Sequence, residues 1–369
     1  FRENYPDLNW AIAGRNKNKL EALKSELNLD CDIFVADSDD YEAIKNFVKQ
    51  TKVVLSAAGP FARYSTKVVE ACVECKTHYT DITGENHWVK GLIDRFHEKA
   101  ALDGTRIVPS CGYDSIPSDL GVYFSVTRSN QPVNHVTVYH SAKGGASGGT
   151  TETMFTMGPL PKEMRDPFLL NPKDSVSETQ KRKSLDNFSV KPIPGTDAFS
   201  GMGLMAFANT RVVRRSSALF DLNQKSYGPD FTFKELGSYP SKAAARITSF
   251  VLMSAFLVIA TPLRYLVRPL LPKPGDGPDK EARDNGWFRG LFIAELEDGS
   301  EKRFEIYGSG DPGYKSTSKM VCEAALTLAF SDDLPFGNEF GGVLTSAVGL
   351  GDPLISRLMK AGITFEALS

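Results

Sequence analysis

The first third of the chain alternates short apolar runs with longer stretches in which apolar residues recur at helical spacing. The apolar runs predict buried strands, and the stretches between them predict amphipathic helices. Val53-Val54-Leu55, the most hydrophobic of the runs, is typical of a central strand covered on both faces. This order indicates a parallel sheet with crossover helices. We predict strands over 8–13, 31–36, 52–58, 78–82 and 105–109, and helices over 16–27, 39–48, 64–75 and 87–101.

From about Gln131 the pattern changes to that of an α+β domain with an antiparallel sheet. Residues 133–141 alternate in polarity, which predicts a strand with one wetter face. Two further runs joined through Asp298-Gly299 predict a hairpin. The hairpin strands are 288–297 and 302–307, and helices are predicted over 151–157 and 314–330. We divide the chain into a Rossmann-type domain over 1–127, an α+β domain over 128–335, and a closing segment over 336–369 that packs back on the body.

One apolar segment, 247–271, differs from the rest of the second domain. No charged residue lies between Arg246 and Arg264. As a helix these seventeen residues would span about 25 Å, slightly less than the ~30 Å hydrocarbon core of a bilayer. Pro262 would kink such a helix near its end. The pattern fits two alternatives equally well: a segment that enters a membrane surface, or a helix buried in a dimer interface.

The charge and the cysteine content of the chain limit which partners and metal ions it can bind. The chain has 369 residues, a formal net charge of −2 and an isoelectric point near 6.3, which argues against a nucleic-acid partner. Five cysteines favour reduced thiols in a cytosolic setting. Cys72 and Cys75 precede His78, but no second ligand pair follows at the spacing of a zinc finger. We therefore predict no metal site.

The predicted strand over 8–13 is followed by Gly14 and Arg15, and these two residues suggest a dinucleotide cofactor. In dinucleotide-binding folds, an acid at the end of the second strand binds the ribose of NAD, whereas an Arg accommodates the 2′-phosphate of NADP. No G-x-G-x-x-G precedes the strand, so we expect the first strand and glycine-rich loop of a Rossmann domain to be missing from this chain. The alternative is the first strand of another α/β fold, with Arg15 a solvated residue at a helix start.

Two polar or glycine-containing loops follow the predicted strands at their carboxyl ends, where open α/β sheets bind ligands. Ala57-Ala58-Gly59-Pro60-Phe61 combines small side chains with a glycine, which lets a cofactor approach the backbone. In the second loop Tyr113 could donate a proton to a substrate oxygen and Asp114 could orient it. Ser118 or Asp119 could equally cap a helix over 120–126. The predicted cofactor-binding residues are Gly14, Arg15, Ala57, Ala58, Gly59, Pro60, Phe61, Cys111 and Gly112, and the predicted catalytic residues are Tyr113 and Asp114.

Three arginines in the second domain form a further charged group. Arg211, Arg214 and Arg215 lie within five positions of one another. Such a group can bind an anion, although a solvated helix face is the commoner outcome.

Several motifs are spread along both halves of the chain: Trp10-Ala11-Ile12-Ala13-Gly14-Arg15, Tyr79-Thr80-Asp81-Ile82-Thr83-Gly84-Glu85, Gly112-Tyr113-Asp114-Ser115-Ile116-Pro117-Ser118-Asp119, Pro272-Lys273-Pro274-Gly275-Asp276-Gly277-Pro278 and Gly310-Asp311-Pro312-Gly313-Tyr314. Together they resemble the saccharopine dehydrogenase-like oxidoreductases, a group that includes the trans-acting enoyl reductases. The resemblance extends over essentially the whole chain. It implies a Rossmann NAD(P)-binding domain followed by an α+β domain that also serves dimerisation. Eukaryotic members of the group are associated with membranes and lipid droplets, which would give segment 247–271 a role.

The sequence therefore predicts an NADP(H)-dependent oxidoreductase, with NAD a less favoured cofactor. Hydride would pass to an unsaturated or carbonyl group of a lipid or acyl substrate, with Arg15 holding the 2′-phosphate. We expect a homodimer at a membrane or lipid-droplet surface that faces the cytosol, or alternatively a cytoplasmic protein. The main alternative function is a non-catalytic scaffold at a membrane or lipid droplet that retains a Rossmann fold. A cofactor-sensing regulator is a third possibility.

Overall fold

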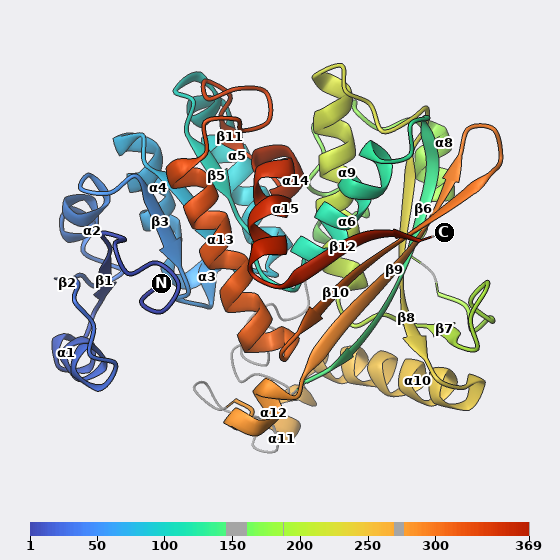
Figure 1. Cartoon of the computed structure of the whole chain (residues 1–369), viewed down its shortest axis with the longest axis horizontal. Helices are drawn as coiled ribbons and strands as arrows, with labels where there is room; N and C mark the ends of the chain where they lie inside the picture. Colours follow the sequence, from blue (N-terminus) through green and yellow to red (C-terminus); the bar gives the residue numbers. More distant parts are fainter. Residues whose placement is uncertain (145–160, 187, 269–276, 369) are drawn as a thin grey trace.

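The computed structural model describes residues 1–144, 161–186, 188–268 and 277–368 (Figure 1). The helix predicted over 151–157 and the last three residues of the apolar segment 247–271 lie outside these residues.

The amino-terminal third has the predicted alternation of strands and helices. Asp40 begins the second helix as an N-cap, since its carboxylate accepts a hydrogen bond from the amide of Ala43. The helix predicted over 64–75 is divided by Ser65 into two helices. The elements are β1 Ala11–Gly14, α1 Lys17–Glu26, β2 Asp32–Val35, α2 Tyr41–Val48, β3 Val53–Ser56, α3 Phe61–Tyr64, α4 Thr66–Cys75, β4 His78–Asp81, α5 Asn86–Leu102, β5 Arg106–Val108 and α6 Ile116–Thr127.

These strands form two separate parallel sheets, and this corrects two expectations about burial. Among the described residues β1 pairs with β2 alone, while β3 is the edge of a four-stranded sheet in the order β11-β5-β4-β3. Neither β1 nor Val53-Val54-Leu55 is covered as predicted: β1 alternates between exposed and half-buried, and the three β3 residues are half-buried. The physical reason is the same for both strands, since each has one edge without a paired neighbour among the described residues.

The second half of the chain forms a six-stranded sheet in the order β12-β10-β9-β6-β8-β7. The predicted hairpin is confirmed as β9 and β10. The sheet is mixed rather than purely antiparallel, because β6 pairs in parallel with β8. Its strands are β6 Val133–Lys143, β7 Phe199–Gly201, β8 Thr232–Tyr239, β9 Trp287–Leu296, β10 Glu301–Ser309 and β12 Ile363–Leu368. The accompanying helices are α8 Glu178–Lys183, α9 Ala206–Leu222, α10 Lys242–Ile259, α11 Arg264–Val267, α12 Lys280–Asp284, α13 Thr317–Phe330, α14 Ser346–Gly349 and α15 Gly351–Lys360.

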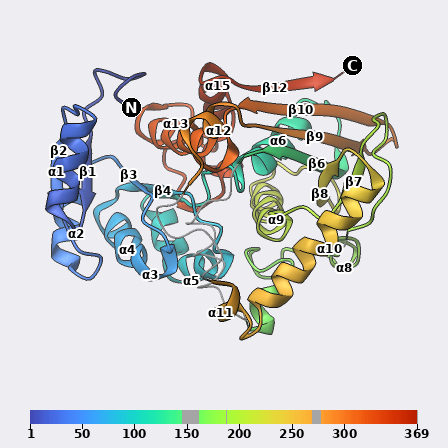
Figure 2. The same ribbon diagram turned by 90° about the horizontal axis from the view of Figure 1, so that it is seen from below.

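Two buried helices, α6 and α9, lie between the two parts of the molecule (Figure 2). Helix α6 packs closely on the six-stranded sheet at Gly121. A Cβ atom at this position would lie only 2.1 Å from the ring of Phe292. Only glycine therefore allows this helix-to-sheet distance. The two helices carry most of the polar groups described below.

The closing segment of the chain joins both sheets. Strand β11 (Gly342–Val343) pairs with β5 in the first sheet, whereas β12 pairs with β10 in the second. Two buried guanidinium groups hold this segment through backbone carbonyls. Arg106 donates to the carbonyls of Pro335, Gly337 and Gly349, and Arg215 donates to that of Val343 at 2.6 Å.

Helix α10 lies along the outer side of the six-stranded sheet, next to β7 and β8 (Figure 2). Among the described residues it is the one helix long and apolar enough to cross a membrane, and only 11% of its length is buried. Ala245 and Ser249 face the protein, and the Ser249 hydroxyl accepts a hydrogen bond from the amide of Met202. The helix thus contacts the body by a narrow stripe.

Candidate active site

The loop after β3 is held by an acid from the next crossover. Ala57, Ala58 and Gly59 are exposed, as a cofactor-contacting loop requires. The buried carboxylate of Glu85 accepts hydrogen bonds from the amides of Phe61 at 2.8 Å and Ala62 at 3.0 Å. These bonds satisfy two of the free amides at the start of α3. Glu85 therefore fixes the turn on which the predicted cofactor residues lie.

A second buried acid joins the carboxyl ends of β4 and β5. Asp81 Oδ1 accepts hydrogen bonds from the amides of Thr83 and Ser110, both at 2.9 Å. Its other oxygen has no partner among the described residues, and burial raises the pKa of Asp81 to about 7. Ser110 adopts a φ of 64°, a region that side chains with a Cβ rarely occupy. The loop from 110 to 115 is thus held in a defined, locally strained geometry.

The predicted catalytic residues lie where this loop meets the second domain. The amide of Tyr113 donates to Thr317 Oγ1 at 3.0 Å, and its ring packs edge-on against Phe288. Burial raises the pKa of Asp114 to about 6. The Asp114 carboxylate lies beside Gly84, where a Cβ would be 3.6 Å from Oδ2. The structure therefore brings Tyr113 and Asp114 to the loops after β4 and β5.

Facing them is a polar cluster that the sequence reasoning missed. Its centre is Glu235 on β8, which is buried. Ser118 Oγ donates to Glu235 Oε2 at 2.7 Å, and Asn209 Nδ2 donates to Oε1 at 3.0 Å. His140 Nε2 lies 2.9 Å from the same serine oxygen. We call Glu235, Ser118, His140 and Asn209 the Glu235 cluster.

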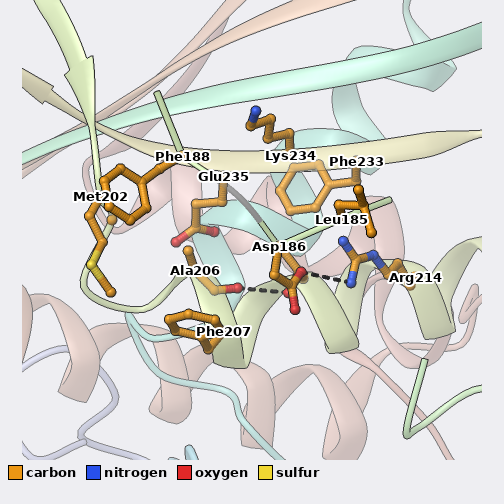
Figure 3. A pocket seen from close by; sticks show the side chains of 12 residues that line it. Leu185, Asp186, Phe188, Met202, Ala206, Phe207, Arg214, Phe233, Lys234 and Glu235 are labelled. Atoms are coloured by element: carbon orange, nitrogen blue, oxygen red, sulfur yellow. Dashed lines mark hydrogen bonds and ion pairs between the residues drawn. The ribbon is translucent and has the colours of Figure 1, made fainter. Parts of the chain in front are cut away.

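Glu235 lines a pocket that is surrounded by both apolar and charged side chains (Figure 3). The Asp186 carboxylate at this pocket pairs with the guanidinium of Arg214 at 3.0 Å. Glu235 contributes its carboxyl group, which points toward Ala206 in Figure 3. The apolar side chains that line the pocket are Leu185, Phe188, Met202, Phe207 and Phe233. Apolar side chains and a buried carboxyl group thus meet at one place.

The alternative role considered for Ser118 and Asp119, capping a helix over 120–126, is wrong. Helix α6 begins at Ile116, so both residues lie inside it and are buried. Ser118 binds Glu235. Asp119 accepts hydrogen bonds from the hydroxyls of Ser216 and Ser346 and from the amide of Ala347. Pro117 accounts for the early start, because proline is favoured in the first turn of a helix.

The solvated helix face expected for Arg211, Arg214 and Arg215 is also wrong. All three are buried on α9. Arg211 and Arg214 pair with Asp186, and Arg215 donates to backbone carbonyls. Segment 161–186 folds over the helix and supplies Asp186 and the Leu170 carbonyl, and β11 supplies the Val343 carbonyl. The local pattern of α9 does not indicate these partners.

The other predicted cofactor residues are less closely connected. Gly14 and Arg15 end β1, where Arg15 is exposed and makes no ion pair with any described residue. Cys111 and Gly112 are buried, and the amide of Cys111 donates to the Asp81 carbonyl at 2.6 Å. None of the contacts among the described residues joins Arg15 to the loops at Ala57 or Tyr113. Over the same residues, no group of three or more metal-ligating side chains is placed to hold a metal ion.

Two of the missed residues carried a signal in the alternation of their strands. His140 is an even number of residues from Val136 and Val138, so it lies with them on the buried face of β6. In the same way, Glu235 lies on the same face of β8 as Phe233. A titratable side chain on the apolar face of a strand is an unusual, informative position. Ser118 and Asn209 carried no comparable signal, since their role depends on how α6 and α9 pack.

The exposed small residues after β3, together with the exposed guanidinium of Arg15 after β1, fit a dinucleotide with a 2′-phosphate. The family model for the saccharopine dehydrogenase NADP binding domain matches residues 2–108. A Mycobacterium tuberculosis protein named as a trans-acting enoyl reductase is 33% identical over 389 residues, covering 98% of this chain and 91% of that protein. The trans-acting enoyl reductase of Mycobacterium ulcerans is 32% identical, covering 97% of this chain and 90% of that protein.

Among solved structures, the apo saccharopine dehydrogenase (L-Glu forming) of Saccharomyces cerevisiae has a similar fold. Its TM-score is 0.54 at 14% identity, covering 98% of this chain and 95% of that one. Together with the 33% identity over nearly the whole chain, this likeness assigns the fold and the family. The chain therefore belongs to the saccharopine dehydrogenase-like family and is an NADP-dependent oxidoreductase.

Proposed function

We propose that this oxidoreductase reduces an unsaturated or carbonyl group of a lipid or acyl substrate with hydride from NADPH. The observation that carries the proposal is the pocket at Glu235, which combines apolar side chains with a buried carboxyl group. The reacting end of the substrate would lie near the Glu235 cluster. The space enclosed at this pocket is about 30 Å³, so the apolar side chains that line it would move apart to admit an acyl chain. The names of the mycobacterial relatives, which describe enoyl reduction, support this substrate class.

The cofactor would lie along the loops that follow β1, β3 and β5. Arg15 would hold the 2′-phosphate with its planar fork of donors. The exposed backbone at Ala57 and Gly59 would allow close approach of the pyrophosphate. Tyr113 and Asp114 would line the substrate side. NADPH supplies the hydride, and the chain positions both reactants and excludes water.

Calorimetry on the protein in its full natural length tests the cofactor assignment. We expect micromolar NADPH binding, which Arg15→Ala weakens by about 10- to 100-fold through loss of a charge-assisted phosphate contact. NADH affinity should stay within about twofold, because NADH carries no 2′-phosphate. The matched control is Arg95→Ala, because Arg95 is also an exposed arginine but lies on α5. Equal affinity for NADPH and NADH would refute the role of Arg15.

We further propose that α10 lies at a membrane or lipid-droplet surface that faces the cytosol. Phe250 is 73% exposed and Leu257 is 64% exposed, so the outer face of the helix is apolar and uncovered in the single chain. Residues 242–268 contain four basic residues and no acid, which complements anionic headgroups. Phe256 of α10 packs against Phe207 at the pocket, so a lipid at this surface would lie next to the proposed substrate site.

Flotation with anionic phospholipid vesicles tests this surface. We expect the protein to float with the vesicles, and Phe250→Glu with Leu257→Glu to prevent flotation by placing charges on the apolar face. Leu102→Glu is the control, since Leu102 is 88% exposed on a different element. If the protein instead sediments as a dimer without binding vesicles, a second copy of the chain covers α10. Vesicle binding without NADPH binding would favour the non-catalytic scaffold.

A further inference from the structure

The carboxyl group of Glu235 has an environment suited to holding a proton. Its side chain is 2% exposed, yet it lines the pocket. The two hydrogen bonds it accepts, from Ser118 and Asn209, use one lone pair on each oxygen. A carboxylate offers about four such positions, so each oxygen can still take a proton.

His140 completes a continuous row of polar atoms behind this carboxyl group. With its hydroxyl hydrogen directed at Glu235, Ser118 accepts at Oγ from His140 Nε2. His140 Nδ1 is buried without a partner among the described residues, which fits a neutral ring protonated at Nε2. Burial lowers the pKa of His140 to about 4, so the ring carries no charge near neutral pH.

Among the described residues, no Lys or Arg forms an ion pair with Glu235. The groups that face it are His140 on β6, and Tyr113 and Asp114 in the loop before α6; Asp186, Arg214 and Lys234 also line the pocket. His140 is 3.8 Å away and neutral, the guanidinium of Arg214 pairs with Asp186, and the Lys234 side chain points away from the Glu235 carboxyl group in Figure 3. A buried carboxyl group without a cation favours its protonated form, and burial raises the pKa of Glu235 to about 7.

We propose that Glu235 is the proton donor of the reduction, and that Ser118, Asn209 and His140 are positioning residues for it. This inference rests on the proposed function. Reduction of a carbon–carbon double bond adds a hydride from NADPH to one carbon and a proton to its neighbour. The Glu235 O–H bond breaks as the new C–H bond forms. The resulting carboxylate is stabilised by Ser118 and Asn209, and it regains a proton from solvent after the product leaves the pocket.

Infrared spectroscopy tests the protonation state without any reaction. The wild-type protein should show the carbonyl stretch of a protonated carboxyl group at pH 6, and Glu235→Gln should lack that band. The band should disappear with a midpoint near pH 7. Glu323→Gln is the matched control, because Glu323 is a buried acid paired with Arg357 away from the pocket. A spectrum at pH 6 that Glu235→Gln leaves unchanged would overturn the proposal.

Kinetics with NADPH and the trans-2-dodecenoyl thioester of N-acetylcysteamine test the chemical role. Glu235→Gln should slow the reduction by about 10²- to 10⁴-fold while the Kd for NADPH stays unchanged. The wild-type rate should fall above pH 7, and the residual rate of the variant should not. A variant within threefold of the wild type at pH 6 would refute the assignment. Failure of the wild type to bind NADPH would instead refute the proposed function and leave the infrared result standing.

Discussion

Helices α6 and α9 each contribute to two buried acids whose surroundings differ. Ser118 and Asn209 bind Glu235 at the pocket. Asp119 follows Ser118 on α6, and Ser216 lies two helical turns after Asn209 on α9. Asp119 and Ser216 meet on the side of the closing segment. We call Asp119, Ser216, Thr345 and Ser346 the Asp119 cluster; it is closed by a hydrogen bond of 2.6 Å between the hydroxyls of Ser216 and Thr345.

Burial raises the pKa of both acids, to about 6 for Asp119 and about 7 for Glu235. Their donors distinguish them. Asp119 is bonded by two hydroxyls and a backbone amide, and these donors tie residues 346–347 to α6. Glu235 has two side-chain donors and borders a pocket. A raised pKa alone therefore does not indicate chemistry, and access to a ligand separates a structural acid from a reactive one.

The largest effect is expected at the structural acid. Asp119→Ala should lower the free energy of unfolding by about 4 kcal/mol, because it removes the acceptor of two buried hydroxyls and a buried amide. Urea denaturation followed by fluorescence measures the change. Asp119→Asn keeps an acceptor oxygen and should lose about half as much. A loss below about 1 kcal/mol for the alanine variant would show that the closing segment is held by other contacts.

Glu235, the reactive acid, should make the free energy of unfolding depend on pH. The folded-state pKa of Glu235, about 7, lies above its ordinary value of 4.5, so the folded protein keeps a proton that the unfolded chain releases between these values. This contribution to stability is present below pH 4.5 and is lost as the pH rises to 7. Relative to Glu235→Gln, the wild type should lose about 1.4 kcal/mol per pH unit across this window.

Urea denaturation of both proteins at several pH values measures this difference. The other buried acids titrate in both proteins, so their contributions cancel in the comparison. A difference that does not change between pH 4.5 and 7 would mean that Glu235 is ionised throughout, and Asp119 would then be the only one of the pair that stores a proton.

The sequence predicted the elements of the first third well, because their hydrophobic periods are local properties of the chain. It placed β3 wrongly at the centre of a sheet, since composition does not say which edges of a strand find a partner. Tyr113 and Asp114 were found by a rule about the carboxyl ends of strands. Whether they take part in catalysis is still a prediction.

Glu235, His140 and Asn209 could not be assembled from the sequence. They come from β8, β6 and α9, and their hydrogen bonds join residues separated by up to 117 positions. Arg215 has the same character, since its partners lie in segment 161–186 and in β11. Such contacts depend on the packing of whole elements, which a single sequence does not specify.

The smallest expected effect compares the two serines that bind the acids. Ser118→Ala and Ser216→Ala each remove one donor from a buried carboxyl group, and each should lower the free energy of unfolding by about 1 kcal/mol. Only Ser118→Ala should raise the infrared midpoint of Glu235, by about 0.7 pH unit, because that hydroxyl stabilises its charged form. Ser216→Ala should leave this midpoint in place. A shift of the Glu235 midpoint in both variants would mean that the two clusters titrate together, and the separation of a structural from a reactive acid would fail.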